Sequence, residues 1–267
     1  MLGLLSLSLL GSLAAGAATH SSEVLLRSSR TKGVVTTFEF KHRLRVCNAY
    51  PNAGAIDVYR DESEKLTTEP MPYKTCKDFK APLRSGDKLE FKVGDASAGT
   101  FAVADLPKND AVLLLVIHRH DTLSTAVSFE SHVFANLANA QVAVIDTYKG
   151  VAHGTPHIMD MPASGQPGRD EALRYDSVVA VNPGVYKVAL DDSQGQERAT
   201  SELVALPRES YVILRTGVES KDGHSYPEDV MVFPQSDPAS VRSSAVHRST
   251  VAGFLTLLVG SFLSQGM

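Results

Sequence analysis

The residues best suited to metal chemistry are two histidines separated by one residue, His118 and His120. Alternate residues of a β-strand project from the same face, so both imidazoles would point to one side and could bind Zn²⁺ or Cu²⁺. No third ligand is fixed by spacing, although His132 and Glu130 lie nearby. A polar strand end that leaves the core explains the pair more simply, and we expect no metal and no other cofactor.

A nucleophile elbow is nearly formed by the segment Gly94-Asp95-Ala96-Ser97-Ala98-Gly99. That motif requires Gly-x-Ser-x-Gly on a turn from a strand into a helix, which exposes the serine hydroxyl. Here Asp95 replaces the first glycine, and the residues on both sides alternate as strands do. We interpret the segment as a hairpin turn and expect the protein not to be an enzyme.

Four side chains are candidates for contacts with a glycan or a protein partner, namely Tyr73, Arg84, Arg119 and Tyr175. Tyrosine and arginine suit this role because each combines a planar group with hydrogen-bond donors. Packing at the edge of a core is the simpler explanation of both tyrosines.

The two cysteines, Cys47 and Cys76, are the only ones in the chain. In an oxidising compartment two thiols tend to pair, and we predict a disulfide that stabilises by roughly 3–4 kcal/mol. Two buried free thiols are the alternative.

The elements that would position these residues occur twice. Each half opens on a strand, gives a turn centred on a tyrosine, continues through a glycine into a second strand, and reaches Leu-Pro before an apolar run. The matched segments are Arg45–Tyr50 and Val142–Tyr148, Met71–Thr75 and Leu173–Ser177, Gly86–Val93 and Gly184–Leu190, and Leu106–Ile117 and Leu206–Leu214. A near-constant offset of about 100 residues predicts two copies of one domain.

The strand pattern predicts an all-β fold of two tandem antiparallel β-sandwich (Ig-like) domains. Lys88–Val93 alternates polar and apolar residues, and Val112–Ile117 is a continuous apolar run typical of a strand buried on both faces. Short strands separated by Gly, Pro and Asn turns are typical of sandwiches. We place domain 1 at 44–120, a linker or crossover at 121–140 in which 127–140 could form a helix, and domain 2 at 141–235. A Gly- and Pro-rich loop is expected at 153–169.

The two ends predict export. Residues 1–18 are Leu-rich and end in small residues, as a signal peptide does, and the run is shorter than the ~20 residues of a spanning helix. Residues 19–43 are expected to form a flexible leader, with a complex-plastid transit peptide as the alternative. Residues 236–267 combine a polar spacer with an apolar tail, which favours a GPI signal attached near Ser236, Ser243 or Ser244. A tail-anchor helix and a packed C-terminal helix remain open.

The net charge of −4 gives no electrostatic reason to expect nucleic-acid binding. An exported location at the cell surface, in a periplasm-like space or in a complex plastid is expected instead. The membrane would be reached through the tail or the GPI anchor.

Two resemblances bear on function. Arg45–Pro51 followed by Ile56-Asp57-Val58-Tyr59 resembles a cell-surface domain family of unknown function. The tandem layout, with Val181-Asn182-Pro183-Gly184, Val204–Glu209 and Val212-Ile213-Leu214, is similar to the periplasmic alginate O-acetylation accessory proteins. That resemblance implies two small β-sandwiches and a non-catalytic partner in polysaccharide acetylation. The cysteines, the long leader and the apolar tail depart from this pattern.

We therefore expect an exported binding or adaptor protein, with a polysaccharide or a polysaccharide-modifying protein as its partner. A structural or adhesive surface protein is the alternative. An enzyme built on His118 and His120 or on Ser97 is the third class.

Overall fold

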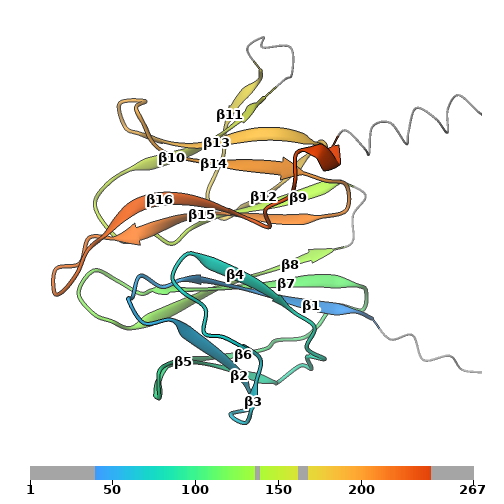
Figure 1. The fold of residues 1–267 in the computed structure, drawn as a ribbon, viewed down its shortest axis with the longest axis vertical. Helices are drawn as coiled ribbons and strands as arrows, with labels where there is room; N and C mark the ends of the chain where they lie inside the picture. Colours follow the sequence, from blue (N-terminus) through green and yellow to red (C-terminus); the bar gives the residue numbers. More distant parts are fainter. Residues whose placement is uncertain (1–39, 136–138, 162–167, 242–267) are drawn as a thin grey trace, which may run out of the picture. The chain divides into compact units, whose positions relative to one another are not determined.

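The computed structural model describes residues 40–135, 139–161 and 168–241 (Figure 1). The predicted signal peptide, most of the predicted leader and the apolar tail lie outside these residues. Ser236 is described, whereas Ser243 and Ser244 are not. Within the described part, no helix has the length and hydropathy needed to cross a bilayer.

The described residues form sixteen β-strands, eight in each half of the chain. The first half contains β1 (His42–Ala49), β2 (Ile56–Arg60), β3 (Glu64–Lys65), β4 (Thr75–Phe79), β5 (Lys88–Val93), β6 (Ala96–Ala102), β7 (Ala111–Arg119) and β8 (Val127–Ala135). The second half contains β9 (Ala140–Asp146), β10 (Gly154–Asp160), β11 (Asp170–Ala172), β12 (Ser177–Val181), β13 (Gly184–Asp192), β14 (Glu197–Ala205), β15 (Ser210–Val218) and β16 (Tyr226–Phe233).

The two halves have the same sheet topology. The first sandwich pairs a sheet of order β3-β2-β5-β6 with one of order β4-β1-β7-β8. The second repeats both orders eight strands later, as β11-β10-β13-β14 and β12-β9-β15-β16 (Figure 1). The prediction of two tandem sandwiches from an internal repeat is thus confirmed. A chance match of motifs would not give the same strand order in both sheets.

One detail of the predicted fold is wrong, because the sheets are not purely antiparallel. β1 runs parallel to β7, and β9 runs parallel to β15. Between β1 and β7, and likewise between β9 and β15, the chain crosses to the other sheet of the sandwich and returns. Such a crossover allows both central strands to point the same way, which a hairpin does not.

Three apolar clusters lie between successive sheets. One fills the first sandwich and includes Val58, Phe91 and Leu115; another fills the second and includes Val188 and Ile213. The third joins the sandwiches and is built from the outer faces of the sheets that contain β1 and β9. Its buried members are Cys47, Ala49, Cys76, Leu114, Val116 and Phe134 from the first sandwich, and Ala143, Ile145, Val212 and Leu214 from the second.

This third cluster explains the continuous apolar runs. On β7, Leu113, Leu115 and Ile117 face the first core, whereas Leu114 and Val116 face the second sandwich. Burial on both faces, predicted for 112–117, is confirmed, and the second sandwich supplies one of the two covers. A lone sandwich would leave this face in water, where an apolar patch of this kind is unfavourable.

Two expected irregular segments contain strands. The predicted linker at 121–140 includes β8, which pairs antiparallel with β7 along its whole length and belongs to the first sandwich. The predicted loop at 153–169 begins with β10, which pairs with β13 and β11. Side-chain alternation in these segments is masked by Ser, His, Gly and Pro, so that neighbouring strands, not local preference, determine their structure.

Candidate functional site

The two histidines of the metal hypothesis do not share an environment. His118 is buried, its Nδ1 lies 2.9 Å from the Arg119 carbonyl oxygen, and its Nε2 has no hydrogen-bond partner among the described residues. Burial lowers the pKa of His118 to about 4, so the 3.9 Å approach of Glu130 is not an ion pair near neutral pH. His120 is exposed and lies beside Ser128. In the described part of the chain, no group of three or more His, Cys, Asp or Glu side chains could hold a metal ion.

The near-elbow around Ser97 is a hairpin turn, as expected. Gly94 and Asp95 connect β5 to β6, and Gly94 has a positive φ of 60°. Ser97 is an exposed residue of β6, which pairs with Lys92 across the hairpin. The motif therefore forms a strand pair, whereas a nucleophile elbow requires a turn into a helix.

Cys47 and Cys76 form a disulfide, which confirms the predicted pair. The two residues lie opposite each other on the antiparallel strands β1 and β4. Both belong to the apolar cluster between the sandwiches. The bond therefore ties the edge strand β4 to its neighbour β1 within the sheet that contacts the second sandwich.

Two of the four candidate contact residues lie where the sandwiches meet. The Tyr73 ring packs edge-on against Tyr226 of the second sandwich, with ring centroids 5.3 Å apart. Arg119 is buried and donates from Nη2 to the Ser220 hydroxyl at 3.3 Å. These positions give both residues structural contacts inside the chain.

The other two candidates lie elsewhere. Arg84 is exposed in a turn, where its backbone N–H donates to Asp87. Tyr175 donates its hydroxyl to the Gly154 carbonyl at 2.9 Å and lies beside the Arg215 guanidinium. A role of any of the four in contacts with a glycan or partner stays a prediction.

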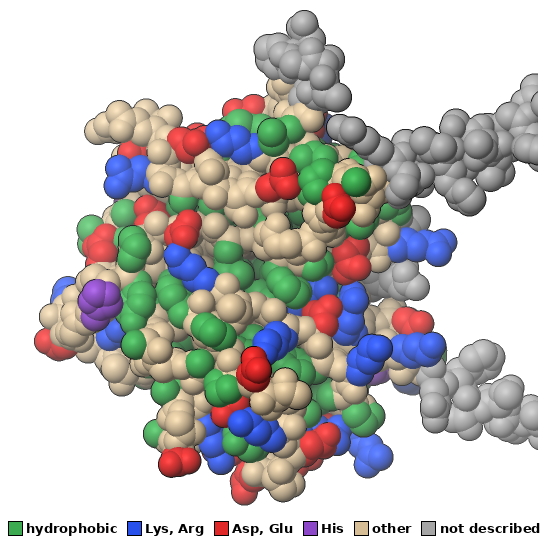
Figure 2. All heavy atoms as spheres, in the orientation of Figure 1, with side chains coloured by type: hydrophobic (Ala, Val, Ile, Leu, Met, Phe, Trp, Pro, Cys, Tyr) green, Lys and Arg blue, Asp and Glu red, His purple; other side chains and the backbone are tan. Residues whose placement is uncertain are grey.

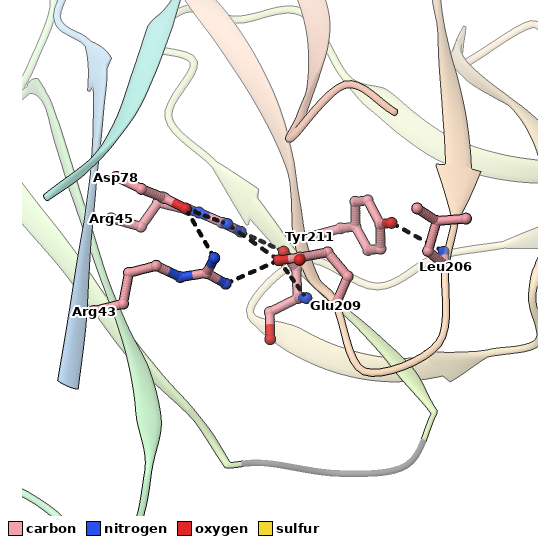
Figure 3. Close-up of polar contacts among 7 residues, drawn as sticks. Arg43, Arg45, Asp78, Leu206, Glu209 and Tyr211 are labelled. Atoms are coloured by element: carbon pink, nitrogen blue, oxygen red, sulfur yellow. Dashed lines mark hydrogen bonds and ion pairs between the residues drawn. The ribbon is translucent and has the colours of Figure 1, made fainter. Parts of the chain in front are cut away.

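A second polar link between the sandwiches centres on Arg45, whose side chain is fully buried. Its Nε and Nη2 donate to the two carboxylate oxygens of Asp78 at 2.7 and 2.9 Å, and its Nη1 donates to the carbonyl of Ser210 in the second sandwich (Figure 3). Arg43 adds a bond from Nη2 to Glu209 at 2.9 Å. The paired bonds to Asp78 orient the guanidinium within the first sandwich, and its Nη1 bond to Ser210 connects it to the second.

The most unusual buried group is Arg215, near the end of β15. Its Nε donates to Glu228 Oε1 at 2.6 Å, its Nη1 to Asp146 Oδ2 at 3.0 Å and its Nη2 to the Ala152 carbonyl at 2.7 Å. The ring of Tyr148 lies 4.4 Å from its central carbon. Burial alone would lower the pKa of Arg215, but the charge of Asp146 and the bond to Glu228 outweigh burial and raise it.

The first sandwich has a different composition at the same place. The strand registers match Arg215 with Ile117 and Asp146 with Asn48. Counting along the strands matches Glu228 with Val127, because Glu228 lies two residues before Val230, the partner of Arg215, and Val127 lies two residues before Phe129, the partner of Ile117. Ile117 belongs to the first apolar core, and Val127 packs against it. A Cβ added to Gly99 would lie 2.6 Å from Val127, so this end of the first sandwich is closed by apolar packing.

We call Arg215, Asp146 and Glu228 the polar cluster of the second sandwich. This cluster lies beneath an open groove of about 510 Å³. The groove runs between the ends of β9 and β15 and the starts of β14 and β16. Its lining residues are Tyr148, Ala152, Glu197, Arg198, Val218, Glu219, Ser225, Tyr226, Pro227 and Glu228. Figure 2 shows acidic and basic side chains interspersed over the face that it draws, without a large field of one sign.

Glu219 is held as a charged acceptor in this groove. Tyr148 donates its hydroxyl to Glu219 Oε1, and the Val151 N–H donates to Oε2 at 3.2 Å. The bond from Tyr148, with that of Val151, keeps the pKa of Glu219 below its usual range. Within the described residues, neither Glu219 nor Arg198 has an oppositely charged partner within 4.0 Å. Of the three carboxylates that line the groove, Glu197 and Glu228 are paired with cations, so Glu219 and Arg198 are the charged groups without an oppositely charged partner among the described residues.

Comparisons with known proteins give little beyond this geometry. No family model and no curated protein matches the chain. Among solved structures, the chain is similar to CBMbc of family CBM26 from Eubacterium rectale Amy13K, solved in complex with maltoheptaose. The two are 10% identical with a TM-score of 0.23, over 73% of this chain and 98% of that one. A score this low transfers no ligand, and the resemblance to alginate O-acetylation proteins is not confirmed.

The sequence analysis missed Arg215 and the groove. Arg215 ends the apolar run Tyr211–Leu214, and there it looks like an ordinary polar strand end. The available signal was a difference between the copies, because the matched run 112–117 ends with Ile117 where the second copy has Arg215.

Proposed function

We propose that the chain is a non-catalytic binding protein that holds a polysaccharide in the groove of its second sandwich. The supporting observation is the exchange of Ile117, Asn48 and Val127 for Arg215, Asp146 and Glu228 at the matched end of the repeat. A buried ionic cluster is a weak source of stability compared with apolar packing. The polar cluster occurs in the second sandwich and not at the matched place in the first. A role in the groove above it therefore explains the cluster better than a contribution to stability does.

The groove suits sugar hydroxyls. A carboxylate accepts and a guanidinium donates hydrogen bonds, so Glu219 and Arg198 together can pair with adjacent hydroxyl groups. The half-buried ring of Tyr226 offers apolar surface for the C–H face of a pyranose, whereas the ring of Tyr148 is buried against Arg215. Tyr226 is supported from behind by Tyr73 of the first sandwich, which makes the groove wall depend on both copies. Open, partly preformed sites with a few convergent polar groups are typical of binding sites.

An exported location is part of this proposal. The Cys47–Cys76 disulfide supports it, because such bonds persist in oxidising compartments. The motifs shared with alginate O-acetylation accessory proteins support a narrower role, as a partner of enzymes that acetylate an exported polysaccharide. Release from intact cells by phospholipase would test the GPI anchor, and co-purification with an acetyltransferase would test the narrower role.

The binding experiment uses calorimetry of the purified chain against a panel of neutral, acidic and amino polysaccharides. Tyr226→Ala and Glu219→Gln should each weaken binding of the positive glycan by about tenfold or more, whereas Tyr59→Ala in the first sandwich should leave it unchanged. Absence of binding across the panel would reject a polysaccharide ligand. An equal loss in all three variants would reject the groove as its site.

A further inference from the structure

A second pocket lies at the opposite end of β15 from the groove, between the two sandwiches. It has a volume of about 180 Å³ and is lined by Lys41, Arg43, Asp110, Ala111, Val112, Phe134, Arg208 and Ser210. β1 and β15 begin there and β8 ends there (Figure 1). Each sandwich contributes to the lining, so the pocket exists only because the two copies dock.

Some of the cationic side chains that line this pocket have an acidic partner, and others do not. Arg43 pairs with Asp78 and Glu209, at 3.4 and 2.9 Å. Lys41 and Arg208 have no carboxylate within 4.0 Å of their side-chain nitrogens among the described residues. The lining carboxylate, Asp110, accepts the backbone N–H of Lys41 at 2.8 Å. Within the described residues, the lining therefore holds two cations without an acidic partner, Lys41 and Arg208, together with the single negative charge of Asp110.

The turn that carries Arg208 is held rigidly on both sides. The Tyr211 hydroxyl accepts the Leu206 N–H at 2.9 Å, and Tyr211 itself is fully buried (Figure 3). The Glu209 carboxylate accepts from Arg43 and, at 3.2 Å, from the Ser210 N–H. Binding groups on a pinned turn lose little freedom when a ligand arrives.

Arg208 has an unfavourable backbone conformation in this turn. Its φ is 63°, in the left-handed region that side chains other than Gly and Asn seldom adopt. Lys108 follows Leu106-Pro107 as Arg208 follows Leu206-Pro207, yet Lys108 has no positive φ. Asp61, Glu62, Lys74 and Asp176 also have a positive φ, and such backbone strain is enriched at ligand-binding sites.

We infer that this pocket binds an anionic group, a carboxylate, sulfate or phosphate, between Lys41 and Arg208. The guanidinium of Arg208 and the ammonium of Lys41 would pair with its oxygens, and the apolar surface of Phe134 and Val112 forms the wall. The group comes either from a small anion or from an acidic polysaccharide. The inference is independent of the groove, which lies at the other end of the second sandwich.

The test is calorimetry of the full chain with inorganic sulfate and with an oligouronate. Arg208→Gly suits the left-handed backbone and should fold at least as well as the parent, while it removes the cation. This variant and Lys41→Gln should each weaken saturable binding by about tenfold. Lys80→Gln and Lys88→Gln remove exposed charges elsewhere in the first sandwich and should change it by less than about twofold.

The binding results distinguish a small-anion site from a site for an acidic polysaccharide. Saturable binding of sulfate alone supports a small-anion site, and binding of the oligouronate as well supports an acidic polysaccharide. Absence of saturable binding of both anions to the parent chain overturns the inference, as does an equal loss in pocket and control variants. Tyr226→Ala, which alters the groove, should retain anion binding, so failure of the groove proposal leaves this result interpretable.

Discussion

Arg215 of the second sandwich stands at the position that Ile117 takes in the first. Both are paired in parallel with the central opening strand of their sheet, Ile117 with Asn48 and Arg215 with Asp146. Ile117 is buried in an apolar core, whereas Arg215 is buried among two carboxylates, a carbonyl and tyrosine rings. The same backbone therefore supports an apolar end in one copy and a charged end in the other.

The first prediction concerns this exchange. Arg215→Ile should lower the free energy of unfolding by about 2–4 kcal/mol, because it leaves Asp146 and Glu228 without their cation. The triple variant Asp146→Asn, Arg215→Ile, Glu228→Val imports the residues of the first copy and should lie within about 1 kcal/mol of the parent. Urea unfolding measures both. Retention of polysaccharide binding by a folded triple variant would contradict a functional role for the cluster.

The second prediction concerns the link between the sandwiches. Arg45→Met should destabilise by about 2–4 kcal/mol, since it removes a buried cation from Asp78, Glu209 and the Ser210 carbonyl. Arg43→Met is the matched control, and its half-exposed side chain should contribute less than about 1 kcal/mol. Denaturant unfolding followed by tyrosine fluorescence gives both values. Similar small losses would show that the apolar cluster alone holds the interface.

The third prediction concerns the disulfide. Replacing Cys47 and Cys76 by Ala should lower stability by about 3–4 kcal/mol, because the bond closes a loop with a sequence separation of 29. The second sandwich has no counterpart, so hydrogen exchange should increase mainly in β1 and β4. Equal increases in β9 and β12 would mean that the two sandwiches unfold as one unit.

The fourth prediction concerns pH. Burial lowers the pKa of His118 to about 4, against 6.5 for a free imidazole. Between these values the unfolded chain binds a proton that the folded chain does not. The free energy of unfolding should therefore fall as pH decreases from about 6.5 to about 4, by up to about 1.4 kcal/mol per pH unit, and level off below.

His118→Asn tests this effect, because the amide can still donate to the Arg119 carbonyl but does not titrate. The difference in stability between parent and variant should change with pH in that window. The comparison cancels the contribution of His132, whose pKa is also lowered by burial. Glu130 lies 3.9 Å from His118 Nε2, and the charges of Lys149 and His120 also act on its pKa. A constant difference from pH 4 to 7 would contradict the prediction.

The internal repeat and the all-β class could be predicted from the sequence, as could the cysteine pair, for which free thiols were the alternative. Alternation in Lys88–Val93 and the recurring Tyr and Leu-Pro landmarks are local patterns, and two cysteines allow a single pairing within the chain. These features follow from short-range sterics and burial, which a linear pattern records.

The docking of the two copies and the positions of the groove and the pocket follow from the tertiary packing. Whether Arg45 or Arg215 is buried depends on which sheet covers it, and the covering strands lie far away in sequence. The groove and the pocket between the sandwiches also depend on tertiary packing, because strand ends far apart in the sequence form their walls. A charged residue at a strand end has the same local pattern whether water or another sheet lies above it, so long-range packing settles its role.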